Sequence, residues 1–309
     1  MILQSNLHID AALTNFSQEY ASQRTEFIGE QVAPPLLVQK QTDKYWIHGG
    51  ESFDLSEVNR APGTQYGEVT WAKSSDSYSA QGFGLSSFVT PEDLKNADPQ
   101  IDPGQDAARI IVDQLMLAYE VRVAALAFSG SVFTQTAALA AADRWNVDTS
   151  NPLHDVQDAK AAVRAKIGVE PNTMVIGYDV WRALQENAGV RKIVFGLNAP
   201  ESIPSEAQVA QALGIGRILV GRAVYRSAAN TFANVWGKCA FIGYIDPAGG
   251  SRSISGLRTF VWGVDGGRYV SRGPIWEDAT KSWKYYVDDY TDEKCTSLYA
   301  AYLYTTVVD

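Results

Sequence analysis

Histidine is the side chain most often used for acid–base chemistry and metal binding near neutral pH, and this chain has three. His8, His48 and His154 are far apart in the sequence, and none stands in a His-Glu-x-x-His or His-x-His context. Asn151 and Pro152 are typical of a helix start, so His154 falls in a first helical turn, where a cation is mildly disfavoured. We expect three structural histidines and a neutral His154 that is packed or hydrogen-bonded.

Glycine-rich and nucleophile motifs could bind phosphates or support hydrolysis. Gly214 and Gly216 open like a dinucleotide fingerprint, but Leu219 stands where the third glycine belongs. This motif also follows an expected helix and precedes an expected strand, which reverses the required order. We interpret it as a helix end and a turn. The chain has no Walker-type phosphate loop and no Gly-x-Ser-x-Gly elbow, and we interpret Ser-Gly-Ser at residues 129–131 as a helix terminus.

The densest group of carboxylates consists of Asp288, Asp289, Asp292 and Glu293. Such a group could bind a divalent cation, but its spacing does not match an EF-hand loop, which needs alternating ligands and a distant Glu. The sequence favours a solvated hairpin tip, with a weak cation site at an interface as the alternative. We therefore expect no catalytic, cofactor-binding or metal-binding residues in this chain.

Two cysteines, Cys239 and Cys295, are too few for a disulfide framework or a Cys-rich metal site. They fall in separate β-rich segments, and buried free thiols are the favoured interpretation.

The composition predicts a folded, acidic protein. Hydrophobic residues make up 46% and aromatic residues 11% of the chain, which is the opposite of a disordered composition. The net charge is −9 and no run of Lys and Arg occurs, so a dedicated nucleic-acid reader is not expected. A container around DNA would tolerate this balance. No secretory signal and no membrane-spanning stretch of about 18 apolar residues is visible, and we expect an untrimmed N-terminus.

The first hundred residues lack the pattern of a compact domain. Leu13, Phe16 and Tyr20 have the spacing of one face of a short helix that begins near Asp10. Residues 49–90 are polar and rich in Gly and Ser, which predicts a long two-stranded ribbon. Because a lone hairpin is marginally stable in water, we expect this early third of the chain to find its stabilising partners on neighbouring copies.

The strongest helix signal covers residues 102–130. Asp102 can cap the helix, Pro103 occupies its first turn, and Gln105 stands where a capping box has its polar partner. A helix of about 25 residues is roughly 38 Å long. Most of its positions are apolar, and a narrow polar stripe is formed by Asp106, Arg109, Asp113 and Glu120. This pattern predicts a central beam with one thin side facing water.

Residues 151–250 have the pattern of an α/β unit. Helices are predicted after Asn151, from Asp179 and after Ser205, which forms a capping box with Gln208. Short strands are predicted at residues 174–176, 217–220, 223–225 and 239–245. In the last 55 residues the pattern predicts strands at 257–262, 282–287 and 298–308. The last two of these strands are expected to pair as a hairpin around residues 288–294.

Several short stretches carry a resemblance to a known family. They are Glu-Phe-Ile-Gly-Glu at 26–30 with Val-Ala-Pro at 32–34, Lys-Tyr at 44–45, Arg-Ala-Pro-Gly at 60–63, Glu-Val-Arg-Val-Ala at 120–124, Ser-Asn-Pro at 150–152, Val-Glu-Pro-Asn-Thr at 169–173 with Ile-Gly-Tyr-Asp-Val at 176–180, Leu-Val-Gly-Arg-Ala at 219–223 and Val-Trp-Gly at 235–237. With the order of elements, they make the chain similar, nearly end to end, to the major capsid proteins of tailed bacteriophages with the Hong Kong 97-type fold.

The resemblance implies an α+β fold with named parts. These are an N-terminal arm at residues 1–35, an extended loop at 49–90 that lies across a neighbouring subunit, a peripheral domain at 36–48, 91–150 and 251–309 that includes the spine helix 102–130, and an axial domain at 151–250. Some relatives form isopeptide cross-links from a loop lysine; Lys73 is the only lysine of the ribbon, and no partner for it is evident.

The resemblance also implies a function without catalysis. The chain would assemble with itself into hexamers and pentamers of an icosahedral head, in the cytoplasm of a bacterial host, and remain in the virion. The head would enclose DNA without sequence-specific binding and without a membrane. Because no room for a scaffolding segment precedes the arm, a separate scaffold protein is expected, together with the portal and optional decoration proteins.

Three other functions fit parts of the pattern. An encapsulin-like nanocompartment would share the architecture, and its gene neighbourhood would lack portal and terminase genes. A soluble α/β enzyme built on residues 151–250 would elute as a small oligomer with a formed pocket. A phage tail or head-decoration protein is disfavoured by the long buried helix, because those proteins are mainly β.

Overall fold

The structure is a computed structural model. It describes residues 10–48, 55, 58–60, 62–63, 65–66, 74–98, 102–196, 202–246, 250, 253–263 and 266–309. His8, Lys73 and most of residues 49–73 of the expected ribbon lie outside the described residues.

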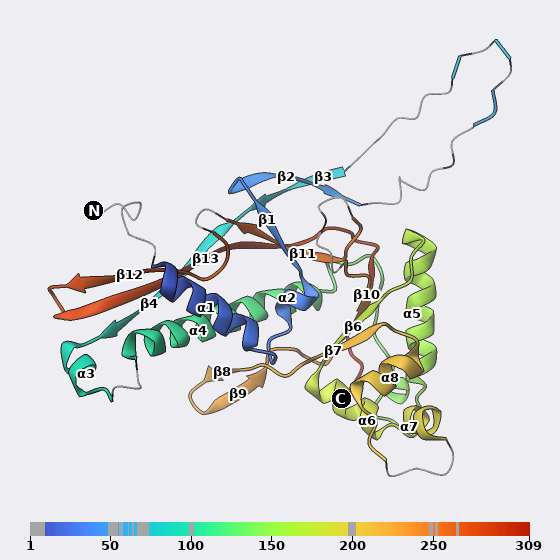
Figure 1. Cartoon of the computed structure of the whole chain (residues 1–309). Coiled ribbons are helices and arrows are strands. Elements are labelled where there is room, and N and C mark those ends of the chain that lie inside the picture. Colours follow the sequence, from blue (N-terminus) through green and yellow to red (C-terminus); the bar gives the residue numbers. More distant parts are fainter. Residues whose placement is uncertain are drawn as a thin grey trace.

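The first of two five-stranded sheets is organised around one long strand, β13 (Ser282–Cys295). β13 pairs antiparallel with β4 (Gln81–Val89), β11 (Leu257–Trp262) and β12 (Val270–Glu277), and β1 (Pro35–Val38) pairs parallel with β11. The 25-residue helix α4 (Pro103–Ala127) packs against β13 and β4. This sheet and helix form the elongated lobe of the molecule (Figure 1).

The second five-stranded sheet forms the other lobe. Its order is β5 (Thr136–Ala137), β14 (Ala301–Tyr304), β10 (Ala240–Gly243), β6 (Thr173–Gly177) and β7 (Arg217–Gly221). Around it lie α5 (Pro152–Ile167), α6 (Tyr178–Glu186), α7 (Ala188–Phe195) and α8 (Glu206–Leu213) (Figure 1). Residues 136–137 and 301–304 therefore belong to the sheet of the expected axial domain, although the sequence analysis assigned them to the peripheral domain.

Two small sheets and three further helices complete the described part of the chain. β2 (Thr42–Ile47) pairs with β3 (Ser74–Ser79), and β8 (Val224–Ala228) pairs with β9 (Thr231–Asn234), both antiparallel. The helices are α1 (Ala11–Gln23), α2 (Gly29–Val32) and α3 (Pro91–Asn96), and a 3₁₀ turn covers Ala141–Asp143. None of the described helices is long and apolar enough to cross a membrane.

The predicted helix boundaries are confirmed because the capping side chains act locally. Asp102 accepts hydrogen bonds from the backbone N–H groups of Gly104 and Gln105 at the start of α4. Asn151 caps α5, and Gly168 ends it with φ of 71°, a conformation that favours glycine. α8 starts with the predicted capping box, and Gly214 ends it, as the turn interpretation required.

The predicted hairpin between residues 282–287 and 298–308 is wrong. β13 continues through residues 288–294 as one strand, and β14 lies in the other sheet beside β10. The physical reason is side-chain pairing. The four carboxylates that suggested a turn are each met by a partner inside the first lobe, so the strand does not need to end there.

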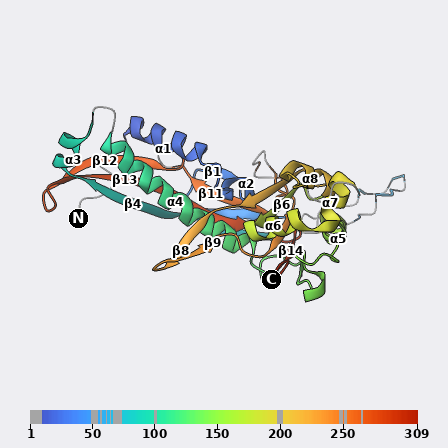
Figure 2. The ribbon, with the colours of Figure 1, turned by 90° about the horizontal axis from the view of Figure 1, so that it is seen from below.

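The helix α4 joins the two lobes, as seen from below in Figure 2. Its first half packs with Ile111 and Leu115 against Val287 of β13. Its second half packs with Val123 and Ala127 into a cluster that also contains β6, β7 and β10 side chains. The predicted central beam is confirmed, since the helix contributes to the cores of both lobes.

Candidate assembly surfaces

The side chain of Glu120 is fully buried where three parts of the chain meet. Its carboxylate accepts hydrogen bonds from the backbone N–H groups of Ile28 (3.0 Å) and Gly29 (2.7 Å) and from Nε1 of Trp236 (2.6 Å). Burial raises the pKa of Glu120 above its ordinary value, and the three hydrogen bonds act in the opposite direction. Glu120 thereby connects α2 and the segment before β10 to the spine helix.

The predicted polar stripe of α4 lies beside the N-terminal arm: Asp106 and Arg109 stay about half exposed, whereas the residues further along the stripe contact the arm. Asp113 accepts a hydrogen bond from the hydroxyl of Tyr20 in α1 at 3.0 Å, and Glu120 lies under α2. The side of α4 that is exposed is instead mostly apolar, at one- and two-turn spacing. Its exposed positions are Gln105, Arg109, Ile110, Gln114, Ala118, Val121 and Ala125, and the last five form the apolar stripe with Gln114 as its polar member. The expectation that Glu120 faces water is therefore wrong, and an apolar helix stripe remains uncovered among the described residues.

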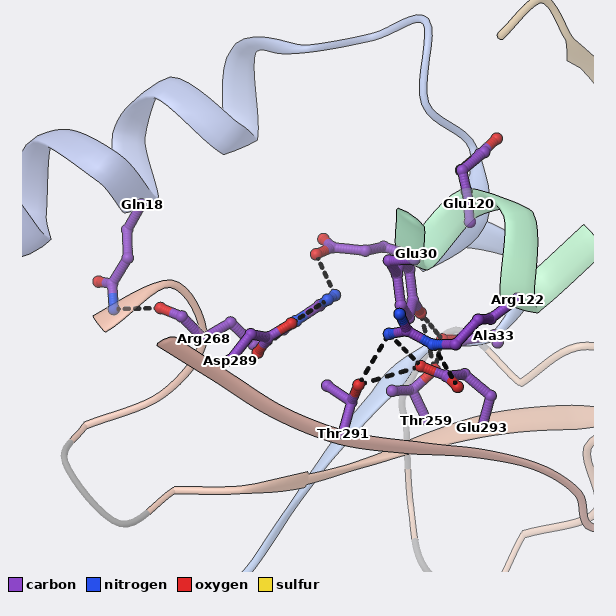
Figure 3. A network of polar contacts seen from close by, with 12 residues as sticks. Gln18, Glu30, Ala33, Glu120, Arg122, Thr259, Arg268, Asp289, Thr291 and Glu293 are labelled. Atoms are coloured by element: carbon purple, nitrogen blue, oxygen red, sulfur yellow. Dashed lines mark hydrogen bonds and ion pairs between the residues drawn. The ribbon is translucent and has the colours of Figure 1, made fainter. Parts of the chain in front are cut away.

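A buried guanidinium joins the arm to the central strand. Arg268 donates to Asp289 (2.7 Å) and to Glu30 (2.6 Å), and its Cζ lies 4.1 Å from the ring centroid of Tyr119. Figure 3 shows Arg268 between the two carboxylates. Desolvation alone would lower the pKa of Arg268, but the adjacent Asp289 more than offsets it, so the pKa lies well above its ordinary value. Arg268 is therefore a permanent cation inside the first lobe.

Arg122 makes a second cross-connection, from α4 to β13 and β4. Its Nε and Nη2 donate to the two oxygens of Glu293 at 3.1 and 3.0 Å, which is bidentate geometry. Nη2 also donates to Thr291, and the guanidinium Cζ lies 3.7 Å from the ring centroid of Phe83. Figure 3 shows Arg122 reaching from the helix to the strand.

The acidic group at residues 288–293 thus holds the subunit together. Besides Asp289 and Glu293, Asp288 accepts from Arg272 at 3.0 Å, and Asp292 accepts from the backbone N–H of Ser79 at 2.8 Å. The predicted solvated hairpin tip is wrong. Within the described ranges, no group of three or more His, Cys, Asp or Glu side chains could hold a metal ion.

The two described histidines lie in different lobes. His48 follows β2, where its backbone N–H donates to Thr296 and its carbonyl accepts from Ser297. His154 lies in the first turn of α5, as predicted, but its side chain is 69% exposed, with Nε2 3.5 Å from Asp158. The expectation of a packed His154 is therefore wrong, because most of the imidazole is exposed and its contact is with Asp158 one turn along α5.

Both cysteines are free, as predicted, and partly buried. Burial raises the pKa of Cys295 to about 12 and that of Cys239 above its ordinary value. Both are therefore thiols at neutral pH, and neither has the thiolate character of a nucleophile.

The arm and the base of the ribbon are docked on the chain's own body. The hydroxyl of Thr14 in α1 donates a hydrogen bond to the backbone carbonyl of Ser271 in β12 and accepts one from its N–H, and β1 is a strand of the first sheet. At the ribbon base, Tyr45 and Tyr78 pack on Phe260 with ring centroids 5.0 and 4.5 Å apart. The expectation that residues 1–90 find their partners on other copies is wrong for these described parts, because they bury apolar and hydrogen-bonding groups internally.

The expected extended loop of residues 49–90 is also shorter in the structure. β3 belongs to the ribbon, but β4 pairs with β13 over its whole length and so belongs to the body. Residues 49–73 fall mostly outside the described residues.

A second two-stranded element, β8–β9, extends below the body in Figure 1. All its side chains are exposed except that of Ala233, and they include Val224, Tyr225 and Phe232, the last 71% exposed. A side-chain bond from Asn234 to Asp179 (3.0 Å) connects its base to α6. Since an isolated hairpin is marginal in water, this element presents apolar side chains without a covering layer among the described residues.

No protein-family model matches the chain. Two curated relatives are each named major capsid protein. The protein from Burkholderia phage BcepMu is 26% identical over 259 residues, which is 77% of this chain and 76% of the relative. The protein from Pseudomonas phage JBD67 is 26% identical over 257 residues, 79% of this chain and 80% of the relative.

Solved structures show the same fold. A phage-related protein from Bordetella bronchiseptica RB50 has a TM-score of 0.82 at 24% identity, covering 98% of this chain and 99% of that one. The capsid of cyanophage P-SCSP1u has a TM-score of 0.59 at 11% identity, with 90% and 87% covered. The SrpI encapsulin of Synechococcus elongatus PCC 7942 has a TM-score of 0.56 at 12% identity, with 90% and 86% covered.

The architecture is thus the Hong Kong 97-type capsid fold, an α+β fold with arm, ribbon, spine helix and two lobes. Its sequence relatives narrow the comparison: over about three quarters of its length the chain is similar to phage major capsid proteins, which are structural subunits of the virion.

Proposed function

We propose that copies of this chain assemble as hexamers and pentamers into the icosahedral head of a tailed bacteriophage, which encloses the DNA genome. The observation that carries the proposal is the pairing of the capsid fold with relatives named major capsid protein over about three quarters of the chain. We assign the first lobe as the peripheral domain and the second lobe as the axial domain around the hexamer and pentamer axes.

Three exposed features support assembly between copies. The ribbon base β2–β3 exposes Trp46, the hairpin β8–β9 presents Phe232 and Val224, and α4 presents an apolar stripe that includes Ile110. Stable obligate interfaces commonly bury more than about 2,000 Å². Several separate contact regions can together bury such an area without one large apolar patch on the subunit. Separate contacts can also adjust independently, which suits identical copies that occupy hexamers and pentamers.

The internal charges support a non-catalytic role. Arg268, Arg122 and Arg272 each engage a carboxylate of β13, so this acidic strand is a structural element. Burial raises the pKa of both thiols, Cys239 and Cys295, so neither supplies a thiolate nucleophile. We infer that the chain is not an enzyme, binds no cofactor and holds DNA without reading its sequence.

The remaining partners follow from this role. A closed head with a unique vertex requires a portal, and correct curvature requires a scaffold, which we propose is a separate protein. Decoration proteins are optional, and assembly takes place in the bacterial cytoplasm. A nanocompartment shell is the second candidate, because an encapsulin shares the fold; genes for portal and terminase beside this one would favour the phage head.

Electron microscopy of the purified full chain, with and without a co-expressed scaffold, tests the proposal. The wild-type protein should form closed particles. A variant in which residues 50–72 are replaced by a short turn should fold, because Tyr45 and Tyr78 at the ribbon base remain, but should not close shells. Circular dichroism and the thermal midpoint serve as folding controls. Normal shells from this variant would contradict the role of the ribbon, and a wild-type protein that stays monomeric would contradict the proposed function.

A further inference from the structure

The strand β4 has one unpaired edge. Its nine residues pair without a register shift to β13 on one side, and no strand pairs with its other side among the described residues. In an antiparallel ladder, alternate residues direct N–H and C=O away from the partner strand. No other described backbone group bonds to residues 81–89, so a row of donors and acceptors is left along this edge.

This edge lacks the usual protection against pairing with another chain. Natural sheets protect their edges with charges, proline, bulges or short strands. The outer strand β12 has such features, since it carries Arg272 and Pro274 and its pairing shifts between Arg272 and Ile275. The edge strand β1 has four residues and starts with Pro35. β4 reads Gln-Gly-Phe-Gly-Leu-Ser-Ser-Phe-Val, with no charge and no proline.

The side chains beside the edge favour an incoming strand. Leu85 and Phe88 are 45% and 48% exposed, and their spacing places them on opposite faces of the sheet. A strand added at the edge would therefore cover one apolar side chain on each face. Lys284, whose Nζ lies 4.9 Å from the Phe88 ring centroid, is engaged by that ring and by Glu277 at 3.4 Å.

The charge distribution favours a second copy as the partner. Each copy has a net charge of −9, so copies repel each other where carboxylates are unpaired. The edge itself is neutral, and the carboxylates of the adjacent β13, Asp288 and Asp289, are paired with Arg272 and Arg268. The same chain also supplies strands with unpaired edges in β2–β3 and β8–β9.

We propose that the free edge of β4 pairs with a strand of a second copy of this chain and so extends the five-stranded sheet across the subunit boundary. The proposal deepens the proposed function and rests on it. It assigns backbone hydrogen bonds, rather than side-chain recognition, as the contact at this edge. Such bonds tolerate small differences in side-chain packing, which suits copies in hexamers and pentamers.

Amide hydrogen exchange of the full chain, as dissociated subunits and as assembled particles, tests this pairing. In dissociated subunits alternate amides of residues 81–89 should exchange rapidly. In particles the same amides should slow by at least ~100-fold. Unchanged exchange in well-formed particles would overturn the proposal and leave the proposed function intact. Protection that appears only when scaffold protein is bound would overturn the second copy as partner, and failure of wild type to form particles would overturn both.

Two adjacent proline variants give an independent test. Ser86 and Ser87 are neighbours in β4, so the N–H of one points to β13 and that of the other points outward. We compare Ser86→Pro with Ser87→Pro. The proline that replaces the N–H directed at β13 should remove a hydrogen bond within the subunit and lower the thermal midpoint. The other should keep the wild-type midpoint but give at least ~10-fold fewer particles, because its missing N–H was a donor to the neighbour. Normal particle yield from the stable variant would overturn the proposal.

Discussion

Individual residues of this protein act mainly as internal connections. Glu120, Arg122 and Arg268 each join segments more than ninety positions apart, from the arm to the central strand. Their charges are buried or half-buried and met by fixed partners. A charge held in this way is costly to leave unpaired, so these residues select one docked position of the arm and helix. The same property makes them poor candidates for catalysis.

The first prediction concerns Gly29. A Cβ at this position would lie 2.7 Å from Oε2 of Glu120 and 2.9 Å from the Tyr119 ring, closer than real side chains approach. Gly29→Ala should therefore push α2 away from α4 and lower the free energy of unfolding by ~1–3 kcal/mol. Gly237→Ala is the matched control, because a Cβ there meets no atom within 4 Å. Urea denaturation measures both, and equal stabilities for the two variants would contradict the close packing at Glu120.

At the scale of elements, β13 and α4 organise the fold. β13 is bordered by β4 on one side and by β11 and β12 on the other, and α4 is covered by both lobes and the arm. The exposed face of α4 carries the apolar stripe, while its polar stripe contacts the arm. Exposed apolar side chains such as Ile110 at one-turn spacing are consistent with a neighbouring copy over this part of the helix.

The second prediction separates the two sides of α4. Leu115 is 6% exposed and packs toward β13, whereas Ile110 is 61% exposed on the same helix. Leu115→Asp should abolish soluble protein, because the core would then hold an unpaired charge. Ile110→Asp adds the same charge but should fold with a wild-type thermal midpoint. Soluble expression and circular dichroism give the readout. A stable Leu115→Asp protein would contradict the burial of this face of α4 in the core.

At the scale of the whole molecule, the chain is a body with two lobes and projecting strands. The ribbon base β2–β3 and the hairpin β8–β9 lie on opposite sides of the view in Figure 1. When different surfaces of identical subunits meet, the contact is head-to-tail, and a rotation that closes produces a ring. This arrangement suits hexamers and pentamers built from one chain.

The third prediction tests the hairpin β8–β9 at this scale. Phe232→Asp should leave the thermal midpoint unchanged, because the ring makes little contact with its own subunit. Particle yield should fall, since a charge would enter an interface between acidic copies. Phe232→Tyr, which keeps the aromatic surface, is the control and should assemble normally. Electron microscopy with size-exclusion chromatography distinguishes the two, and equal particle yields would exclude the hairpin from the contacts.

Local structure was determined by the sequence itself. Asp102, Asn151 and Ser205 start helices and Gly168 and Gly214 end them, because capping bonds involve residues only a few positions apart. The buried strand at residues 174–176 and the free cysteines follow from the same short-range patterns. The order of elements, together with the short motifs from residues 26–30 to 235–237, indicated the resemblance to the capsid fold.

Only the tertiary structure decided how distant segments pair. Residues 288–293 look like a turn by composition, yet they form a strand because Arg122, Arg268 and Arg272 arrive from elsewhere to neutralise them. Glu120 looks solvent-facing by its helical stripe, yet α2 and Trp236 cover it. In each case the partner lies well over ten positions away, and the free energy of burying a charge depends on that partner and not on the neighbouring residues.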